Sequence, residues 1–346
     1  MKIGSKEIGG DNDVFIIAEL SANHNHDKRV AVDTIKAAKK TGADAIKLQT
    51  YTPDTLTIDC DNEYFTINQN TLWDGKTLYE LYKEAYTPWE WHEDLFRIAR
   101  EEGLECFSSP FDSTAVDLLE ELNTPAYKIA SFEIQDVPLI ELAASKGKPI
   151  ILSTGIATKE DIELAVVTCR KAGNNDIALL KCTSSYPAPI ELANLNTMVD
   201  MKKQFNVEVG LSDHTMGNVV PIVATSLGAT IIEKHFILDK NLGGPDAAFS
   251  LDPEEFSSLV QDVRNARLSL GNVTYEVPEK VQANRKFARS LFVVQDVKEG
   301  DLVTENNVRS IRPGYGMHPK HYKSALGKKF IADCEKGTPL NNEMIK

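Results

Sequence analysis

The chain has 346 residues, a hydrophobic fraction of 42% and a formal net charge of −13 at pH 7. This length predicts one large domain and a small one, and the acidic balance argues against a nucleic-acid partner, since phosphate backbones select basic surfaces. No apolar run reaches the roughly 20 residues of a membrane span, and the N-terminus lacks the apolar part of a secretory signal. We therefore expect a cytoplasmic protein with no membrane partner.

Eight apolar runs of strand length recur along the chain, and a segment with helical spacing follows each of them. The predicted strands are Val14–Leu20, Ala45–Thr50, Leu104–Ser108, Ala126–Ser131, Pro149–Thr154, Ile177–Thr183, Val207–Asp213 and Thr230–Phe236. The predicted helices are Val30–Thr41, Trp89–Glu102, Ser113–Leu122, Pro138–Lys146, Lys159–Ala172, Leu195–Phe205, Asn218–Leu227 and Pro253–Leu270. Eight such units in about 250 residues predict a TIM (β/α)8 barrel. A doubly wound open sheet is the alternative, but no G-x-G-x-x-G follows the first strand.

Two regions depart from this alternation. The insert Tyr51–Thr87 is either a lid or substrate-binding loop over the barrel or a surface excursion. After a catalytic domain over residues 1–270, the polar segment 271–285 suits a linker. Residues 286–346 then carry short strands and turn dipeptides, which predicts a small β-rich domain near the lower size limit for folding alone. Docking against another surface would stabilise it.

Polar residues stand at the carboxyl end of nearly every predicted strand. Buried parallel strands are normally apolar throughout, and their carboxyl ends meet at one edge, so this pattern indicates an active site. The residues are Glu19, Ser21, Asn23, Lys47, Gln49, Lys128, Ser131, Glu133, Ser153, Lys181, Ser184, Tyr186, Ser212, Asp213, His214, Glu233, Lys234 and His235.

The lysines in this set predict an anion site. Any one of them could form a structural ion pair with a glutamate such as Glu233. Too many cations converge, however, for that explanation to cover them all: Lys47, Lys128, Lys181 and Lys234. With the hydroxyls of Ser131, Ser153 and Ser184, they suit a phosphate or carboxylate group.

The two histidines predict a metal site. His214 and His235 end adjacent strands with carboxylates nearby, which favours a divalent metal over a structural role. Two nitrogen ligands and no thiolate leave an open coordination shell, as suits Mn²⁺, with Mg²⁺ and Co²⁺ as alternatives. Asp246, just past the last strand, is either a contact to a polar substrate or a turn residue. The five cysteines are odd in number and include no C-x-x-C pair, which fits reduced thiols better than disulfides or a zinc site: Cys60, Cys106, Cys169, Cys182 and Cys334.

Ordered motifs along the whole chain resemble the sialic acid synthase family. They are IIAELSANHNHD, GADAIKLQTY, YKIASFE, ILSTGIAT, LLKCTSSYPAP, VGLSDHT and IEKHF. The tail ARSLFVVQDVKEGDLVTENNVRSIRPG is similar to the family's C-terminal antifreeze-like (SAF) domain. Within the family, WDGKTLYELYKEAYTPWEWH, CFSSPFD and RPGYGMHPKHY are most like the pseudaminic acid synthases.

The resemblance implies condensation of phosphoenolpyruvate with an N-acetylated amino sugar in its open aldehyde form. By resemblance, His214 and His235 bind the metal and Glu19 acts on the water that adds to the substrate. The implied phosphoenolpyruvate contacts are Lys47, Lys128, Ser131, Ser153 and Ser184. Position 184 tends to be Asn in sialic acid synthases. The implied sugar contacts are Gln49, Glu133, Tyr186, Asp246 and, from the small domain of the partner in a domain-swapped homodimer, Arg312.

Other functions stay open at this point. The same chemistry could act on the precursor of legionaminic acid or of N-acetylneuraminic acid. A non-catalytic carbohydrate-binding barrel is a second class of function. A third is a barrel aldolase that forms a Schiff base on Lys128 or Lys181.

Overall fold

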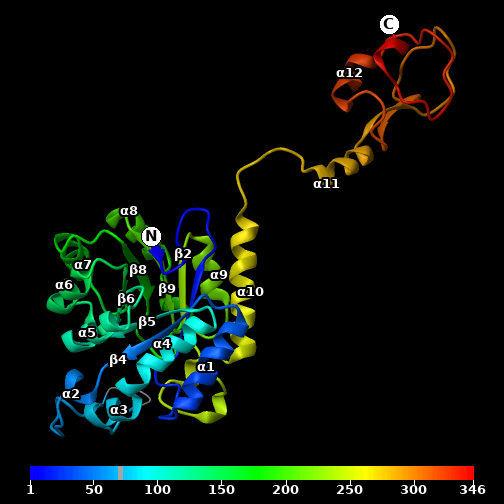
Figure 1. Cartoon of the computed structure of the whole chain (residues 1–346). Helices are drawn as coiled ribbons and strands as arrows, with labels where there is room; N and C mark the ends of the chain where they lie inside the picture. Colours follow the sequence, from blue (N-terminus) through cyan, green and yellow to red (C-terminus); the bar gives the residue numbers. More distant parts are fainter. Residues whose placement is uncertain (69–72) are drawn as a thin grey trace. The chain divides into compact units, whose positions relative to one another are not determined.

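The structure is a computed structural model that describes residues 1–68 and 73–346. Over these residues the chain divides into two compact units, Met1–Gly271 and Asn272–Lys346 (Figure 1). Each unit has its own apolar core, the first between barrel strands and helices and the second among short strands and turns.

The first unit is a closed barrel of parallel strands, so the predicted TIM barrel is confirmed. In the described residues its hydrogen-bonded order is β10-β3-β4-β5-β6-β7-β8-β9. The strands are β3 (Phe15–Glu19), β4 (Ala45–Thr50), β5 (Glu105–Pro110), β6 (Tyr127–Ile129), β7 (Ile150–Ser153), β8 (Ile177–Cys182), β9 (Glu208–Asp213) and β10 (Ile231–His235). Each lies within two residues of its predicted bounds at either end.

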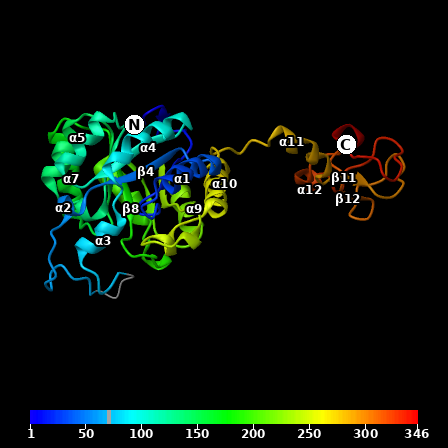
Figure 2. The same cartoon turned by 60° about the horizontal axis from the view of Figure 1, so that its bottom comes forward.

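Helices surround the barrel (Figures 1 and 2). They are α1 (Lys28–Thr41), α4 (His92–Glu101), α5 (Ser113–Glu121), α6 (Val137–Ser145), α7 (Lys159–Lys171), α8 (Asn196–Phe205), α9 (Val219–Ser226) and α10 (Pro253–Leu270). Side-chain caps set several starts: Thr158 and Asp161 form a capping box on α7, and Asp252 with Glu255 does the same on α10. These caps satisfy backbone N–H groups that the first turn leaves free.

The end of the barrel at which the strands begin is closed by apolar residues. A two-stranded hairpin, β1 (Lys2–Ile3) and β2 (Lys6–Glu7), precedes the barrel. Ile3 and Ile8 from this segment join the interior cluster that contains Phe15, Phe107 and Ile231. The hairpin was not predicted, because two-residue strands carry no readable periodicity. The polar residues therefore lie at the opposite end, where the strands finish.

The insert after β4 is partly helical. It contains α2 (Pro53–Leu56) and α3 (Leu78–Ala85), each begun by a capping box, and a 3-10 turn, η1 (Trp89–Trp91), follows it. Both helices lie at the end of the first unit opposite the N-terminal hairpin (Figure 1). Residues 69–72 of the insert lie outside the described residues. Buried His24 ties the loop after β3 to the insert through a hydrogen bond between its Nε2 and Thr87 Oγ1, 3.1 Å.

The second unit is small and rich in turns. Its antiparallel strands are β11 (Ser290–Val293) and β12 (Val308–Ile311), and its helices are α11 (Glu279–Gln282) and α12 (Tyr322–Ala325). The 3-10 turns of the chain's remaining loops are η2 (Ser131–Glu133), η3 (Ile190–Leu192), η4 (Lys240–Leu242), η5 (Ala247–Phe249), η6 (Ala283–Phe287), η7 (Pro319–His321) and η8 (Asn342–Met344). The segment expected to be a plain linker thus includes α11 and part of η6. No helix in the described chain is long and apolar enough to cross a membrane.

Candidate active site

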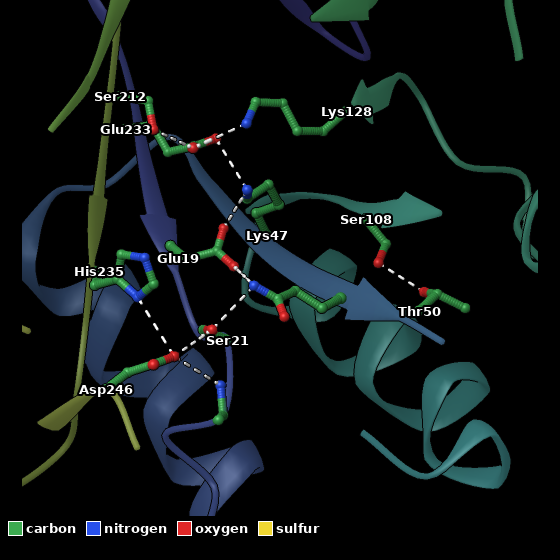
Figure 3. A network of polar contacts seen from close by, with 12 residues as sticks. Glu19, Ser21, Lys47, Thr50, Ser108, Lys128, Ser212, Glu233, His235 and Asp246 are labelled. Carbon is green, nitrogen blue, oxygen red and sulfur yellow. Dashed lines mark hydrogen bonds and ion pairs between the residues drawn. The ribbon is translucent and has the colours of Figure 1, made fainter. Parts of the chain in front are cut away.

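Two lysines and two glutamates form a buried ion-pair network at the carboxyl ends of the strands (Figure 3). Lys47 Nζ lies 2.5 Å from Glu19 Oε2 and 3.3 Å from Glu233 Oε2. Lys128 Nζ lies 3.1 Å from Glu233 Oε1, which also accepts a hydrogen bond of 2.9 Å from Ser212 Oγ. All four charged side chains are buried. Glu233 therefore joins the two cations across the barrel interior.

The network perturbs the acidity of its members. Burial lowers the pKa of Lys47, Glu233 opposes this effect and Lys128 adds to it, and the net result is a pKa of about 7. Burial disfavours the charged form of Glu233, but the cations of Lys128 and Lys47 hold its pKa below the ordinary value. An anionic ligand that paired with Lys47 and Lys128, as Glu233 does, would stabilise both ammonium groups, since opposite charges in a poorly solvated site interact strongly.

A second chain of polar contacts leads from Glu19 toward His235 (Figure 3). Gln49 Nε2 donates to Glu19 Oε1 at 3.1 Å and to Ser21 Oγ at 3.0 Å. Ser21 Oγ donates to Asp246 Oδ2 at 2.5 Å, and that oxygen lies 3.7 Å from His235 Nδ1. Side chains from the ends of β3, β4 and β10 are thereby held in one connected arrangement.

Hydroxyl groups converge at the ends of β6, β7 and β8. Ser131 Oγ accepts a hydrogen bond of 3.1 Å from the backbone N–H of Gly155. A Cβ atom at Gly155 would lie 2.0 Å from Ser184 Oγ and 2.7 Å from Ser131 Oγ, so the serines pack directly against the glycine. Within the described chain, the buried Oγ atoms of Ser153 and Ser184 have no hydrogen-bond partner. These hydroxyls are donors available to an anion.

His214 and His235 lie side by side, with ring centroids 5.3 Å apart. The Nδ1 atom of His214 is 3.0 Å from the carbonyl of Thr183, and donation to that oxygen leaves Nε2 with its lone pair. His235 Nδ1 has no hydrogen-bond partner in the part of the chain that the structure describes, and burial lowers the pKa of His235. An imidazole nitrogen with a free lone pair fits a divalent metal. At His214, contacts with Cys182 and Thr183 outweigh the effect of burial and raise the pKa, so a metal would compete with a proton for this ring. Among residues 1–68 and 73–346 no group of three or more His, Cys, Asp or Glu side chains forms a closed metal site.

Three further residues named from the sequence occupy different surroundings. The ring of Tyr186 stacks near His214, with centroids 4.4 Å apart. Glu133 has a buried carboxylate oxygen with no hydrogen-bond partner in the described residues, and burial raises its pKa to about 7. Arg312 lies in the second unit, just after β12, where it is exposed and forms no ion pair with the described residues.

Two lysines expected in the cluster are engaged elsewhere. Side chains alternate between the two faces of a strand, so Lys181 and Lys234 face away from the interior that Leu180 and Glu233 share. Lys234 forms an ion pair with Asp213 and donates to the carbonyl of Thr215. Lys181 donates to the carbonyl of Cys182 at 2.7 Å. The structural interpretation thus fits Lys234, whose ion pair is with an aspartate, whereas Lys181 has only a backbone hydrogen bond among the described residues.

Some polar groups at this end of the barrel were not singled out from the sequence. Ser109 is buried, pairs in register with Gln49, and has an Oγ atom without a hydrogen-bond partner in the described residues. Because side chains alternate along a strand and Phe107 faces the barrel interior, the sequence could have predicted that Ser109, two residues later, also faces inward. The role of Ser21 could not be read from the sequence, because its contact with Asp246 joins residues 225 apart.

Comparison with known proteins gives the family. The NeuB family model matches residues 34–275, and the SAF domain model matches residues 288–346. The pseudaminic acid synthase of Helicobacter pylori is 52% identical over 332 residues, with 96% of this chain and 97% of that protein covered. The N,N'-diacetyllegionaminic acid synthase of Legionella pneumophila is 36% identical over 348 residues, with 99% and 98% covered.

A solved structure supports the same assignment. The crystal structure of N-acetylneuraminic acid (sialic acid) synthetase from Leptospira borgpetersenii, in complex with citrate, is 33% identical to this chain. Its TM-score is 0.73, and the match covers 82% of this chain and 94% of that one. These matches make the barrel that of a sugar-acid synthase. The chain belongs to the NeuB family and carries a SAF domain, which confirms the resemblance read from the motifs.

Proposed function

We propose that the chain is a pseudaminic acid synthase. The enzyme condenses phosphoenolpyruvate with 2,4-diacetamido-2,4,6-trideoxy-L-altrose and water, and it releases pseudaminic acid and phosphate. The observation that carries this proposal is near full-length identity of 52% to the Helicobacter pylori pseudaminic acid synthase, against 36% to the Legionella pneumophila legionaminic acid synthase. The five free cysteines are in keeping with a cytoplasmic enzyme.

Phosphoenolpyruvate is held by the lysine and serine groups. Lys47 and Lys128 approach within 3.3 Å of one shared carboxylate, so an anionic substrate can bridge the same two cations. The hydroxyls of Ser153 and Ser184, which have no hydrogen-bond partner among the described residues, and that of Ser131 donate to its phosphate or carboxylate oxygens.

The histidines bind a divalent metal, which we take to be Mn²⁺. When bound, the metal supplies Lewis-acid polarisation of the sugar aldehyde. His214 and His235 are held for this purpose by Thr183 and by the packing of Phe249, whose ring centroid is 4.9 Å from that of His235. Gln49, Glu133, Tyr186 and Asp246 surround the same end of the barrel and contact the sugar hydroxyl groups.

Glu19 acts on the water of the reaction. As C3 of phosphoenolpyruvate bonds to the aldehyde carbon, the carbonyl π electrons move to the aldehyde oxygen, and water meets the electron deficiency that develops at C2. Glu19 accepts one proton from that water as it adds to C2, and this proton goes to the aldehyde oxygen, which becomes a hydroxyl. The C2–O bond to phosphate then breaks, the remaining proton of the C2 hydroxyl leaves with the phosphate, and the keto acid forms. The carboxylate is oriented for this role by Lys47 at 2.5 Å and by Gln49 at 3.1 Å.

The site is completed by a second copy of the chain. Arg312 is exposed within its own unit, and the described residues offer it no ion-pair partner. In a domain-swapped homodimer it reaches an N-acetyl group of the sugar bound to the other barrel. A chain ending at Gly271 should therefore keep its barrel and lose most of its activity, whereas full activity of that truncated chain would refute the role of Arg312.

Turnover with defined sugars tests the proposal. The pure protein is incubated with Mn²⁺, phosphoenolpyruvate and each of three sugars, the precursors of pseudaminic, legionaminic and N-acetylneuraminic acid, while phosphate release is measured. We expect turnover with the first sugar and loss of turnover in EDTA. No turnover with any sugar would indicate a binding protein. Turnover that survives EDTA, with an adduct trapped by borohydride on Lys128, would indicate a Schiff-base aldolase.

A further inference from the structure

Ser21 has a backbone conformation that a residue with a side chain rarely adopts. It directly follows the end of β3, and its φ angle is +47°, in the left-handed region that glycine favours. Its side chain is buried at the barrel mouth, with 3% of its surface exposed. A serine occupies this position in spite of the strain, which points to a role for its hydroxyl.

The hydroxyl joins two groups from distant parts of the barrel. It donates to Asp246 Oδ2 at 2.5 Å and accepts from Gln49 Nε2 at 3.0 Å (Figure 3). The next backbone amide, that of Ala22, donates to the same Asp246 oxygen at 3.4 Å. The left-handed turn therefore aims one hydroxyl and one N–H at a single carboxylate oxygen.

These donors hold the carboxylate of Asp246, while other contacts hold its backbone. Asp246 directly precedes the turn η5, and its carbonyl accepts a hydrogen bond of 2.7 Å from Ser250 Oγ. The N–H of Leu251 donates to the carbonyl of His235 in β10 at 2.9 Å. The other close neighbour of the Asp246 carboxylate is His235, whose Nδ1 is 3.7 Å from the bonded oxygen. Gln49 is also shared, because its amide nitrogen donates to Glu19 as well as to Ser21. Ser21 thus connects the segment after β10 to the carboxylate at the end of β3.

We propose that Ser21 is a positioning residue for the sugar: it fixes Asp246 and Gln49 relative to each other at the distance that the sugar hydroxyl groups require. The proposal rests on the function proposed above, in which Asp246 and Gln49 contact the sugar. The lysine and serine contacts proposed for phosphoenolpyruvate lie at the ends of other strands, whereas the described side-chain contacts of Ser21 are with Asp246 and Gln49.

Two substitutions separate the hydroxyl from the backbone conformation. Ser21→Gly removes the hydroxyl and relieves the strain, whereas Ser21→Ala removes the hydroxyl and keeps the strain. In both variants we expect the KM for the sugar to rise about tenfold, the factor that loss of a hydrogen bond to a charged group brings. The KM for phosphoenolpyruvate should not change. Ser21→Gly should melt at a higher temperature than Ser21→Ala.

Further variants test the connection to Asp246. In an Asp246→Asn background, Ser21→Gly should raise the KM for the sugar by less than twofold, because the hydroxyl has already lost its charged partner. Thr34→Val serves as the control, since it removes a buried hydroxyl that donates only to the carbonyl of Val30 in α1. This control should leave both KM values unchanged.

The outcomes are distinct. Wild-type protein that turns over none of the three sugars would overturn both the proposed function and the role of Ser21. Wild-type turnover together with an unchanged sugar KM in Ser21→Gly would overturn the role of Ser21 alone. A Ser21→Gly effect that fully adds to that of Asp246→Asn would also overturn it, because independent sites give additive effects.

Discussion

Replacing Glu19 by Gln tests the proposed proton transfer with little change in shape. Glutamine keeps the volume of the side chain, and its amide oxygen can still accept the hydrogen bond from Gln49, which is 3.1 Å long in the structure. The amide cannot take a proton from water at neutral pH. The substitution therefore removes the basic group and preserves most of the packing around it.

The size of the effect follows from the contacts of Lys47. Loss of general base catalysis lowers kcat about 10²- to 10⁴-fold, or roughly 3 to 5 kcal/mol in the activation free energy. The free energy of unfolding should fall less. Lys47 loses a carboxylate at 2.5 Å but keeps Glu233 at 3.3 Å. We expect a loss of about 2 kcal/mol, below the range for a fully orphaned buried charge.

The assay is phosphate release from phosphoenolpyruvate and the sugar at saturating concentrations, with thermal melting measured in parallel. Glu120→Gln is the matched control, since Glu120 also binds a lysine, Lys148, at 2.6 Å, and accepts from Tyr127 at 2.5 Å. It should retain full kcat. A Glu19→Gln enzyme that melts normally and keeps more than about a tenth of the wild-type kcat would refute the role of Glu19 as the base.

Three further predictions concern other parts of the chain. Burial lowers the pKa of both His24 and His92 from 6.5 to about 4, so between these pH values the unfolded chain binds more protons than the folded chain. The free energy of unfolding should therefore fall as the pH drops from 6.5 to 4, by up to about 3 kcal/mol for each histidine. A melting temperature that stays constant over this pH range would contradict the prediction. Gly155→Ala should raise the KM for phosphoenolpyruvate about tenfold and leave the KM for the sugar unchanged, because the new methyl group would lie 2.0 Å from Ser184 Oγ. Equal changes in the two KM values would show that the serines do not hold phosphoenolpyruvate. Arg312→Ala should raise the KM for the sugar about tenfold at unchanged melting temperature, and steady-state kinetics that match the wild type would exclude Arg312 from the site.

Local patterns in the sequence were enough to predict the barrel. Buried parallel strands are apolar over their whole length, and helices carry caps and a regular apolar spacing, so each unit can be read independently of the others. The last barrel helix has the predicted bounds, Pro253–Leu270. The N-terminal hairpin was missed because its strands are too short for any pattern to develop.

The partners of the polar residues could not be predicted in the same way. Lys128 and Glu233 are separated by 105 residues, and their contact depends on the register of strands around the whole barrel. The face of the strand on which each residue lies could be predicted from the sequence. Because side chains alternate along a strand, Lys234 lies on the opposite face from Glu233 and His235. The left-handed turn at Ser21 depends on its tertiary contacts, and a serine carries no local sign of this conformation.

The ion pairs at the barrel mouth change how a charged substrate should respond to ionic strength. Lys47 and Lys128 already have carboxylates as partners. In the proposed site, binding of phosphoenolpyruvate would exchange one counter-ion for another inside a desolvated space, where dissolved salt screens little. Outside that space, the chain's net charge of −13 repels an approaching anion. Added salt weakens this repulsion while the internal exchange stays unaffected. The KM for phosphoenolpyruvate should therefore stay constant or decrease with moderate salt, the reverse of the behaviour of an exposed basic binding patch.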